Sequence, residues 1–203
     1  MRHPVDRPLL ILTLALLGAG LLIISSASVV LSQKNFGTPY YYTLHQGAAA
    51  ILGLAGLAVA QAIPYRSWKK FALPILFASL LLVAAVFIPR YGFHAGGASR
   101  WLRLGPITIQ PSEILKLSLI LYLASWLDKK KREHKNFIGA FVPFLVIMGV
   151  IAVLLVLQPD IGTLIIIGGS AIILYFLGGG RVTQLITFVI LGAVGLAALI
   201  KVA

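Results

Sequence analysis

Cysteine is absent from the 203 residues, and charged side chains are scarce, at 11% of the chain. The lack of cysteine excludes disulfides, thiolate catalysis and cysteine-ligated metal sites. An ordinary soluble domain carries roughly 25% charged residues, so this chain has too little charge to cover the surface of a water-soluble globule. Intrinsic disorder requires low hydrophobicity, and 60% of these residues are hydrophobic. The composition therefore indicates a membrane protein.

Seven apolar stretches approach the roughly 20 residues that a helix needs to cross about 30 Å of hydrocarbon. They cover residues 9–31, 42–63, 71–88, 111–127, 141–157, 161–177 and 182–202. The first ends near the small residues Ser25-Ser26-Ala27-Ser28, which resemble a signal cleavage site. Because the run is long and the whole chain is apolar, we expect an uncleaved helix instead. The expected fold is all-α, a polytopic bundle of about seven transmembrane helices in a single membrane domain over residues 1–203.

Basic residues outnumber acidic ones by 17 to 5, and their positions predict the orientation in the membrane. With the N-terminus inside, eleven Lys and Arg fall in cytoplasmic segments and five in outer segments. Cytoplasmic loops collect Lys and Arg, so the N-terminus is predicted to be cytoplasmic and the loop at 89–110 to lie outside. Nucleic-acid binding is not expected, because the basic residues lie at helix ends rather than on one folded face.

The outer loop from Tyr91 to Pro106 combines glycines with Arg100, Trp101 and Arg103. An arginine presents a planar fork of donors suited to phosphate or carboxylate. A tryptophan ring settles at the level of the membrane interface. The loop therefore is a candidate binding segment, and the alternative is an ordinary loop with one interfacial tryptophan.

Gln110-Pro111-Ser112-Glu113 begins the fourth apolar stretch, and Lys116 follows within it. Proline suits the first helical turn, and an acidic residue there complements the helix dipole. Glu113 and Lys116 are three residues apart, so on a helix they can pair. Charges inside a membrane helix are functional candidates by default, and the alternative is a structural pair that locks two helices together.

A second Gln-Pro motif, Gln158-Pro159-Asp160-Ile161-Gly162-Thr163, joins the fifth and sixth stretches. Asp160 has no cation near it in the sequence. It is therefore solvated, caps the following helix, or pairs through space with an arginine or with Lys116. His45 is interpreted as a packing residue, and no two histidines have the i, i+4 spacing typical of a metal site. Gly178-Gly179-Gly180 predicts a tight cytoplasmic turn.

Together these runs resemble the signature segments of the SEDS family (shape, elongation, division and sporulation), whose members include FtsW, RodA and SpoVE. The resemblance rests on three motifs in order across the whole chain, listed here as they stand: Gly97-Ala98-Ser99-Arg100-Trp101-Leu102, Gln110-Pro111-Ser112-Glu113 with Lys116, and Gln158-Pro159-Asp160-Ile161-Gly162-Thr163. Early segments such as Phe36-Gly37-Thr38-Pro39-Tyr40-Tyr41 favour the division branch, the FtsW type.

The resemblance implies a bacterial inner-membrane glycosyltransferase that polymerises lipid II on the outer face. No cofactor and no metal ligand are assigned from the sequence. It would work beside a class B penicillin-binding protein. The residues expected to hold the lipid-linked substrate are Arg100, Trp101, Arg103, Glu113, Lys116 and Asp160. Residues with a structural part in the motifs are Gln110, Pro111, Ser112, Gln158, Pro159, Gly162 and Thr163. Two other functions remain open, a lipid II transporter and a scaffold that docks the penicillin-binding protein.

The family fold has ten helices, and its proposed catalytic base lies in a large outer loop after the seventh. The sequence given ends at Ala203, so on this resemblance it is expected to be truncated or one part of a split gene. No catalytic base is assigned within residues 1–203, and the chain by itself is expected to be inactive.

Overall fold

The computed structural model of the chain describes residues 6–88, 92–95, 98–104, 107–129 and 137–202. The contacts among them form two compact units, Met1–Tyr65 and Arg66–Ala203.

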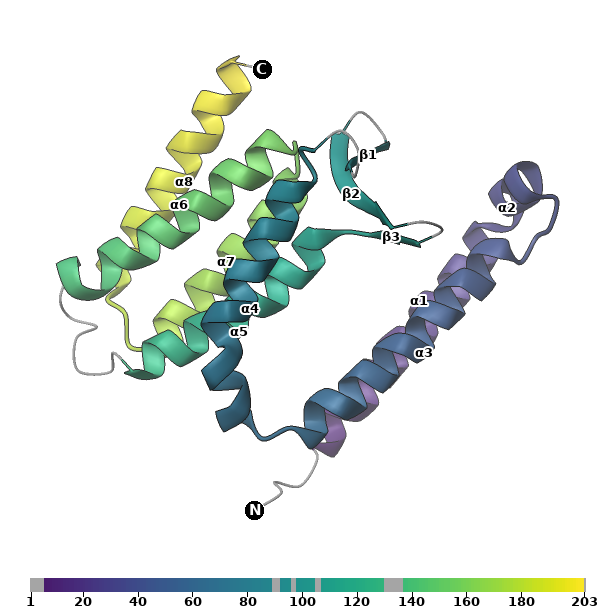
Figure 1. The fold of residues 1–203 in the computed structure, drawn as a ribbon, viewed down its shortest axis with the longest axis horizontal. Coiled ribbons are helices and arrows are strands. Elements are labelled where there is room, and N and C mark those ends of the chain that lie inside the picture. Colours follow the sequence, from purple (N-terminus) through teal and green to yellow (C-terminus); the bar gives the residue numbers. More distant parts are fainter. Residues whose placement is uncertain (1–5, 89–91, 96–97, 105–106, 130–136, 203) are drawn as a thin grey trace. The chain divides into compact units, whose positions relative to one another are not determined.

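The first unit consists of α1 (Arg7–Ala27), α2 (Val29–Phe36) and α3 (Tyr41–Ala62), with α1 and α3 side by side (Figure 1). Ser28 separates α1 from α2, and its hydroxyl donates to the Ile24 carbonyl at 2.7 Å. Serine hydroxyls that bond back to the preceding turn often bend a helix. The expectation of one helix over 9–31 is therefore wrong, because α1 ends at Ala27 and a second helix continues the chain.

Ser32 closes the connection between α2 and α3. Its buried hydroxyl donates to the Thr38 carbonyl at 2.7 Å and accepts the Tyr41 backbone N–H at 3.0 Å. The Tyr41 ring stacks on Phe36 with centroids 3.7 Å apart and on His45 at 5.8 Å. His45 thus packs within an aromatic cluster, in line with its interpretation as a packing residue.

The second unit contains five α-helices, and α7 contacts α5, α6 and α8 (Figure 1). The helices are α4 (Tyr65–Ala85), α5 (Pro111–Lys129), α6 (Val142–Leu157), α7 (Ile161–Leu177) and α8 (Val182–Val202), and a π-helical turn (Phe137–Phe141) precedes α6. Four of the five begin and end within two residues of the predicted stretches. The exception is α4, which begins at Tyr65 instead of residue 71, so residues 65–70, between two predicted stretches, form its first turns.

The segment 89–110, expected to be a loop, instead contains three antiparallel strands in the order β1-β2-β3. They are β1 (Gly92–Ala95), β2 (Ala98–Leu104) and β3 (Ile107–Ile109). Phe93 pairs with Trp101 and His94 pairs with Ser99, so the register passes over Arg100. Such a β-bulge bends the strand and re-aims a side chain.

The core of the second unit is built from apolar residues spaced three or four apart on facing helices. This spacing places them on one stripe of each helix. Its fully buried members include Val83, Leu115, Leu119, Leu123, Phe144, Ile151, Leu155, Ile167, Ala171 and Tyr175. Between α4 and α5 the buried hydroxyls of Ser79 and Ser118 lie 2.7 Å apart and share a hydrogen bond.

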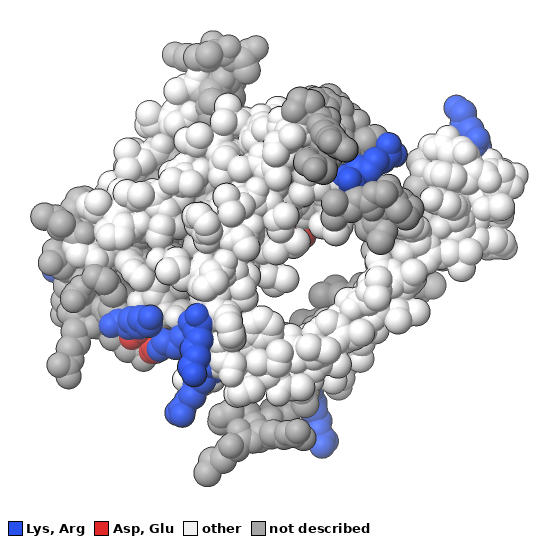
Figure 2. All heavy atoms as spheres, in the orientation of Figure 1, with Lys and Arg blue, Asp and Glu red and all other residues white. Residues whose placement is uncertain are grey.

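Within the described residues, four helices are long and apolar enough to cross a membrane: α1, α3, α4 and the stretch Gly139–Leu157. α7 and Val182–Gly195 are shorter apolar helices. On the face drawn in Figure 2 most side chains are uncharged. The predicted helical membrane fold is confirmed, while the count of seven spans, the cytoplasmic N-terminus and the single domain stay predictions.

Candidate functional site

Asp160 lies between α6 and α7, and its side chain is only 5% exposed. Its Oδ1 accepts the Thr163 backbone N–H at 3.4 Å, so it is the N-cap of α7. An N-cap side chain satisfies one of the amides that a helix start leaves without a partner. Helix capping, one of the three environments of Asp160 that the sequence left open, is therefore present in the structure.

Arg100 reaches the same place from β2. Its Nε donates to the Gln158 carbonyl at 3.4 Å, and an Nη donates to the Pro159 carbonyl. Its other Nη lies 4.0 Å from Asp160 Oδ1, which makes an ion pair. The through-space arginine partner of Asp160 is thus Arg100, which is also the residue that the pairing of β1 with β2 passes over.

The start of α5 supplies the third set of contacts. Gln110 Nε2 and Ser112 Oγ donate to Asp160 Oδ2 at 3.4 and 3.3 Å. Pro111 is the first residue of α5 and is buried, where its missing N–H leaves no donor unsatisfied. The structure therefore brings together the three motifs that the sequence analysis singled out, around one buried carboxylate.

Glu113 and Lys116 form the expected pair, with Nζ 2.7 Å from Oε1. The side chains are 57% and 24% exposed. Lys116 also borders a cavity of only about 10 Å³ between α5 and α7. On the outer side of α5 it borders a more open hollow of about 420 Å³, lined also by Glu113, Ile114 and Leu117. A cation thus lies at the edge of a mainly apolar surface.

The remaining predicted residues lie nearby in the chain and differ in burial. Trp101 is half-buried and Arg103 is exposed, and both belong to β2. Thr163 lies in the first turn of α7 and is buried. Gly162 is exposed, and a Cβ there would meet no atom within 4 Å, so the structure gives no steric reason for glycine.

Sequence reasoning missed two contacts that hold this region together. Gln158 is buried, and its Nε2 donates to the Val83 carbonyl of α4 at 2.7 Å. Arg100 donates hydrogen bonds to two backbone carbonyls. No sequence pattern predicts such side chain-to-backbone bonds. Among the described residues, no group of three His, Asp or Glu side chains lies close enough to hold a metal ion.

The fold and this region define a class, that of multi-pass helical membrane proteins with a polar cluster at one end of the helices. A family model described as cell cycle protein, covering FtsW, RodA and SpoVE, matches residues 7–203. The chain belongs to this family, as the sequence motifs predicted.

Relatives agree with the family assignment. The chain is 40% identical over 186 residues to a probable peptidoglycan glycosyltransferase FtsW of Geobacter metallireducens, which covers 92% of this chain and 50% of the relative. A second FtsW of that name, from Geobacter sulfurreducens, is 42% identical over 87% of this chain and 47% of its own length. The chain thus spans about half the length of these curated relatives.

Solved structures show the same fold. The rod shape determining protein RodA of Thermus thermophilus matches with a TM-score of 0.66 and 30% identity, over 90% of this chain and 58% of that one. A chain of a peptidoglycan synthase complex, described as coordinating polymerization and crosslinking, matches with a TM-score of 0.63 and 29% identity, over 91% and 53%.

Proposed function

We propose that this chain forms the lipid II-binding part of an FtsW-type peptidoglycan glycosyltransferase, which acts in the bacterial inner membrane during cell division. The printed names of its relatives support the activity. The single observation that carries the proposal for this chain is that β2, the start of α5 and the α6–α7 turn all meet at Asp160. The same start of α5 also carries the Glu113–Lys116 ion pair.

Lipid II joins a pyrophosphate to a long isoprenoid tail, so its site needs cations beside an apolar surface. Lys116 supplies an ammonium group at the open hollow that the apolar side chains of Ile114 and Leu117 also line. Arg103 supplies a guanidinium on the exposed part of β2, and guanidinium groups match phosphate geometry. Trp101 adds a flat ring for the sugar or the isoprenoid. Glu113 keeps the Lys116 side chain in place through the ion pair.

In the reaction, a sugar hydroxyl attacks the sugar carbon that carries the pyrophosphate, so a glycosidic bond forms while the bond from that carbon to the pyrophosphate breaks. Positive groups that stabilise the departing charge lower the barrier, and Lys116 and Arg103 are our candidates for that role. The attacking hydroxyl also needs a base, which typically contributes about 10² to 10⁴-fold, and no residue of 1–203 is assigned to it. We therefore expect this chain by itself to form no glycan from lipid II.

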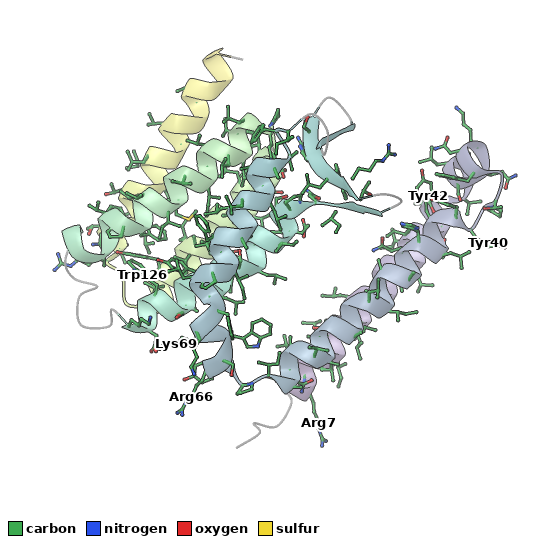
Figure 3. The ribbon with its side chains drawn as sticks, in the orientation of Figure 1. Arg7, Tyr40, Tyr42, Arg66, Lys69 and Trp126 are labelled. Atoms are coloured by element: carbon green, nitrogen blue, oxygen red, sulfur yellow. The ribbon has the colours of Figure 1, made fainter. Side chains whose placement is uncertain are left out.

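Binding of lipid II to the purified chain in nanodiscs tests the proposal. Lys116→Ala and Arg103→Ala should each weaken binding roughly tenfold, since a hydrogen bond to a charged group is worth about 1.5–3 kcal/mol. Arg66→Ala at the start of α4 (Figure 3) is the matched control and should leave binding unchanged. Equal losses in all three variants, or glycan made by the chain alone, would contradict the proposed roles.

A class B penicillin-binding protein is the partner we propose, because one solved relative belongs to a complex that couples polymerization to crosslinking. Co-purification from detergent tests this contact. A lipid II transporter is the rival activity, and it would be revealed if the chain in liposomes moved fluorescent lipid II between leaflets.

A further inference from the structure

We propose that Asp160 is a positioning residue that fixes the β-sheet against the starts of α5 and α7. The group formed by Asp160, Arg100, Gln110 and Ser112 is called the clasp below. Its effect on lipid II binding rests on the proposed function, whereas its effect on the position of the sheet does not.

Burial separates Asp160 from the residues proposed to touch substrate. Its side chain is 5% exposed, whereas that of Glu113 is 57% exposed. A carboxylate taken out of water is costly unless its oxygens are paired. Both oxygens are paired here with other parts of the protein, so the side chain holds its neighbours rather than a ligand.

The two oxygens of Asp160 serve different elements. Oδ1 accepts the Thr163 N–H of α7 and faces the Arg100 guanidinium of β2. Oδ2 accepts from Gln110 and Ser112, at the start of α5. The hydrogen bonds are 3.3–3.4 Å long, at the far end of the usual range. The carboxylate therefore acts through its charge and the number of its partners, not through one strong bond.

Capping α7 needs only one of these contacts. Serine and asparagine cap helices about as well as aspartate, but the shorter serine side chain has a single oxygen. The second oxygen and the negative charge of Asp160 are therefore surplus to capping. They are what joins α5 and β2 to the α6–α7 turn.

Arg100 extends the clasp to the backbone of the turn. Its guanidinium donates to the carbonyls of Gln158 and Pro159 while it faces Asp160. Gln158 in turn donates to Val83 of α4. Without the negative charge of Asp160, the guanidinium loses its ionic partner, and β2 is then held to the turn by fewer contacts.

A spin-label distance measurement tests the position of the sheet directly. Labels on cysteines placed at Thr108 in β3 and Ile173 in α7 report the separation of sheet and helix, and no native cysteine interferes. Both positions are exposed. The wild type and Asp128→Asn should give the same narrow distribution, because Asp128 pairs with Lys69 at 2.6 Å, apart from the clasp.

Asp160→Ser decides between capping and clasping. We expect its distance distribution to be at least 1.5-fold broader than that of the wild type, because it keeps the cap and loses the contacts to α5 and Arg100. Ser112→Ala, which removes one contact from the α5 side, should broaden it less. A distribution for Asp160→Ser that matches the wild type would overturn the proposal, since capping alone would then suffice.

Lipid II binding measures the consequence for the proposed site. The Kd of Asp160→Ser, measured well below the unfolding temperature of the variant, should rise roughly tenfold, equivalent to about 1.4 kcal/mol. An unchanged Kd beside a broadened distance would overturn the link between clasp and substrate. If the wild type binds no lipid II, the proposed function fails, and the distances alone decide whether Asp160 positions the sheet.

Discussion

The first unit and the second unit both contain helices apolar enough to cross a membrane, yet they differ in burial. In α1 and α3 no residue is buried, whereas about a third of the apolar stretch Gly139–Leu157 is buried. Apolar composition therefore separates membrane helices from soluble ones, but it does not distinguish a helix with a packed core from one without.

The difference in burial between the two units follows their polar residues more closely than their apolar ones. The second unit buries polar side chains on or beside each of its five α-helices, including Ser79, Ser112, Ser118, Gln158, Asp160 and Gln184, whereas the described residues of the first unit bury Ser32. Lipid is as apolar as leucine, so burying apolar side chains does not drive helices together in a membrane. Hydrogen bonds such as that between Ser79 and Ser118 then select which faces meet.

The predicted orientation gives the largest expected effect, because labelling from one side is all or none. Figure 3 places Arg66 and Lys69 on the first turns of α4. By the count of Lys and Arg, cysteines at Lys34 and Thr108 should react with an impermeant reagent from outside, and cysteines at Arg66 and Lys129 only after the membrane is opened. Lys34 and Thr108 reacting from opposite sides would contradict the predicted topology, which puts both residues outside.

The two units also differ in how closely other atoms surround their glycines. A Cβ at Gly180 would lie 2.2 Å from the ring of buried Tyr175, whereas one at Gly53 in α3 would meet no atom within 4 Å. Gly180→Ala should therefore destabilise the fold by about 1–3 kcal/mol, the usual cost of overpacking. Thermal unfolding in detergent measures it, with Gly53→Ala as the matched control. Similar unfolding temperatures for both variants would contradict the packed turn between α7 and α8.

The sequence predicts the helices of this fold well and its polar contacts only in part. Helix α7 lies where the apolar run predicts, because Asp160 caps its start and glycines follow its end. The break at Ser28 was missed, since a single serine in an apolar run leaves the average hydropathy high. The sheet was missed because its strands are short, and their pairing depends on residues distant from the apolar stretches.

For the candidate site, too, the sequence predicts the residues and the local contacts but not the long-range contacts. The motif residues were predicted from their polarity inside apolar surroundings, and the Glu113–Lys116 pair follows from a spacing of three on a helix. The partner of Asp160 was left open, because Arg100 lies 60 residues earlier in the chain. Only the packing of β2 against the α6–α7 turn brings the two together, and periodicity gives no information on contacts of that range.

The pair of Glu113 and Lys116 should show coupling of intermediate size. Neither side chain is buried within the protein, but α5 is predicted to cross the membrane, where removing one partner of an ion pair leaves a charge without compensation. Glu113→Gln or Lys116→Met alone should therefore lower stability more than the double variant, with a coupling of about 0.5–2 kcal/mol. A double-mutant cycle on unfolding in nanodiscs measures this. If the losses of stability in the two single variants simply add up in the double variant, the ion pair is not a stabilising contact.

The smallest expected effect is at the other end of the second unit, where Lys69 Nζ lies 2.6 Å from Asp128. These side chains are 30% and 43% exposed, and exposed pairs contribute only about 0.2–1 kcal/mol. Lys69→Met should cost no more than this at low salt and nothing measurable in 1 M salt, where the Debye length falls to about 3 Å. Lys70→Met, next along α4, is the control for the loss of a positive charge, and its stability should not depend on salt in this way. A loss in Lys69→Met that persists in 1 M salt would mean that this pair is shielded like the clasp, and the contrast between the two ends of the second unit would then fail.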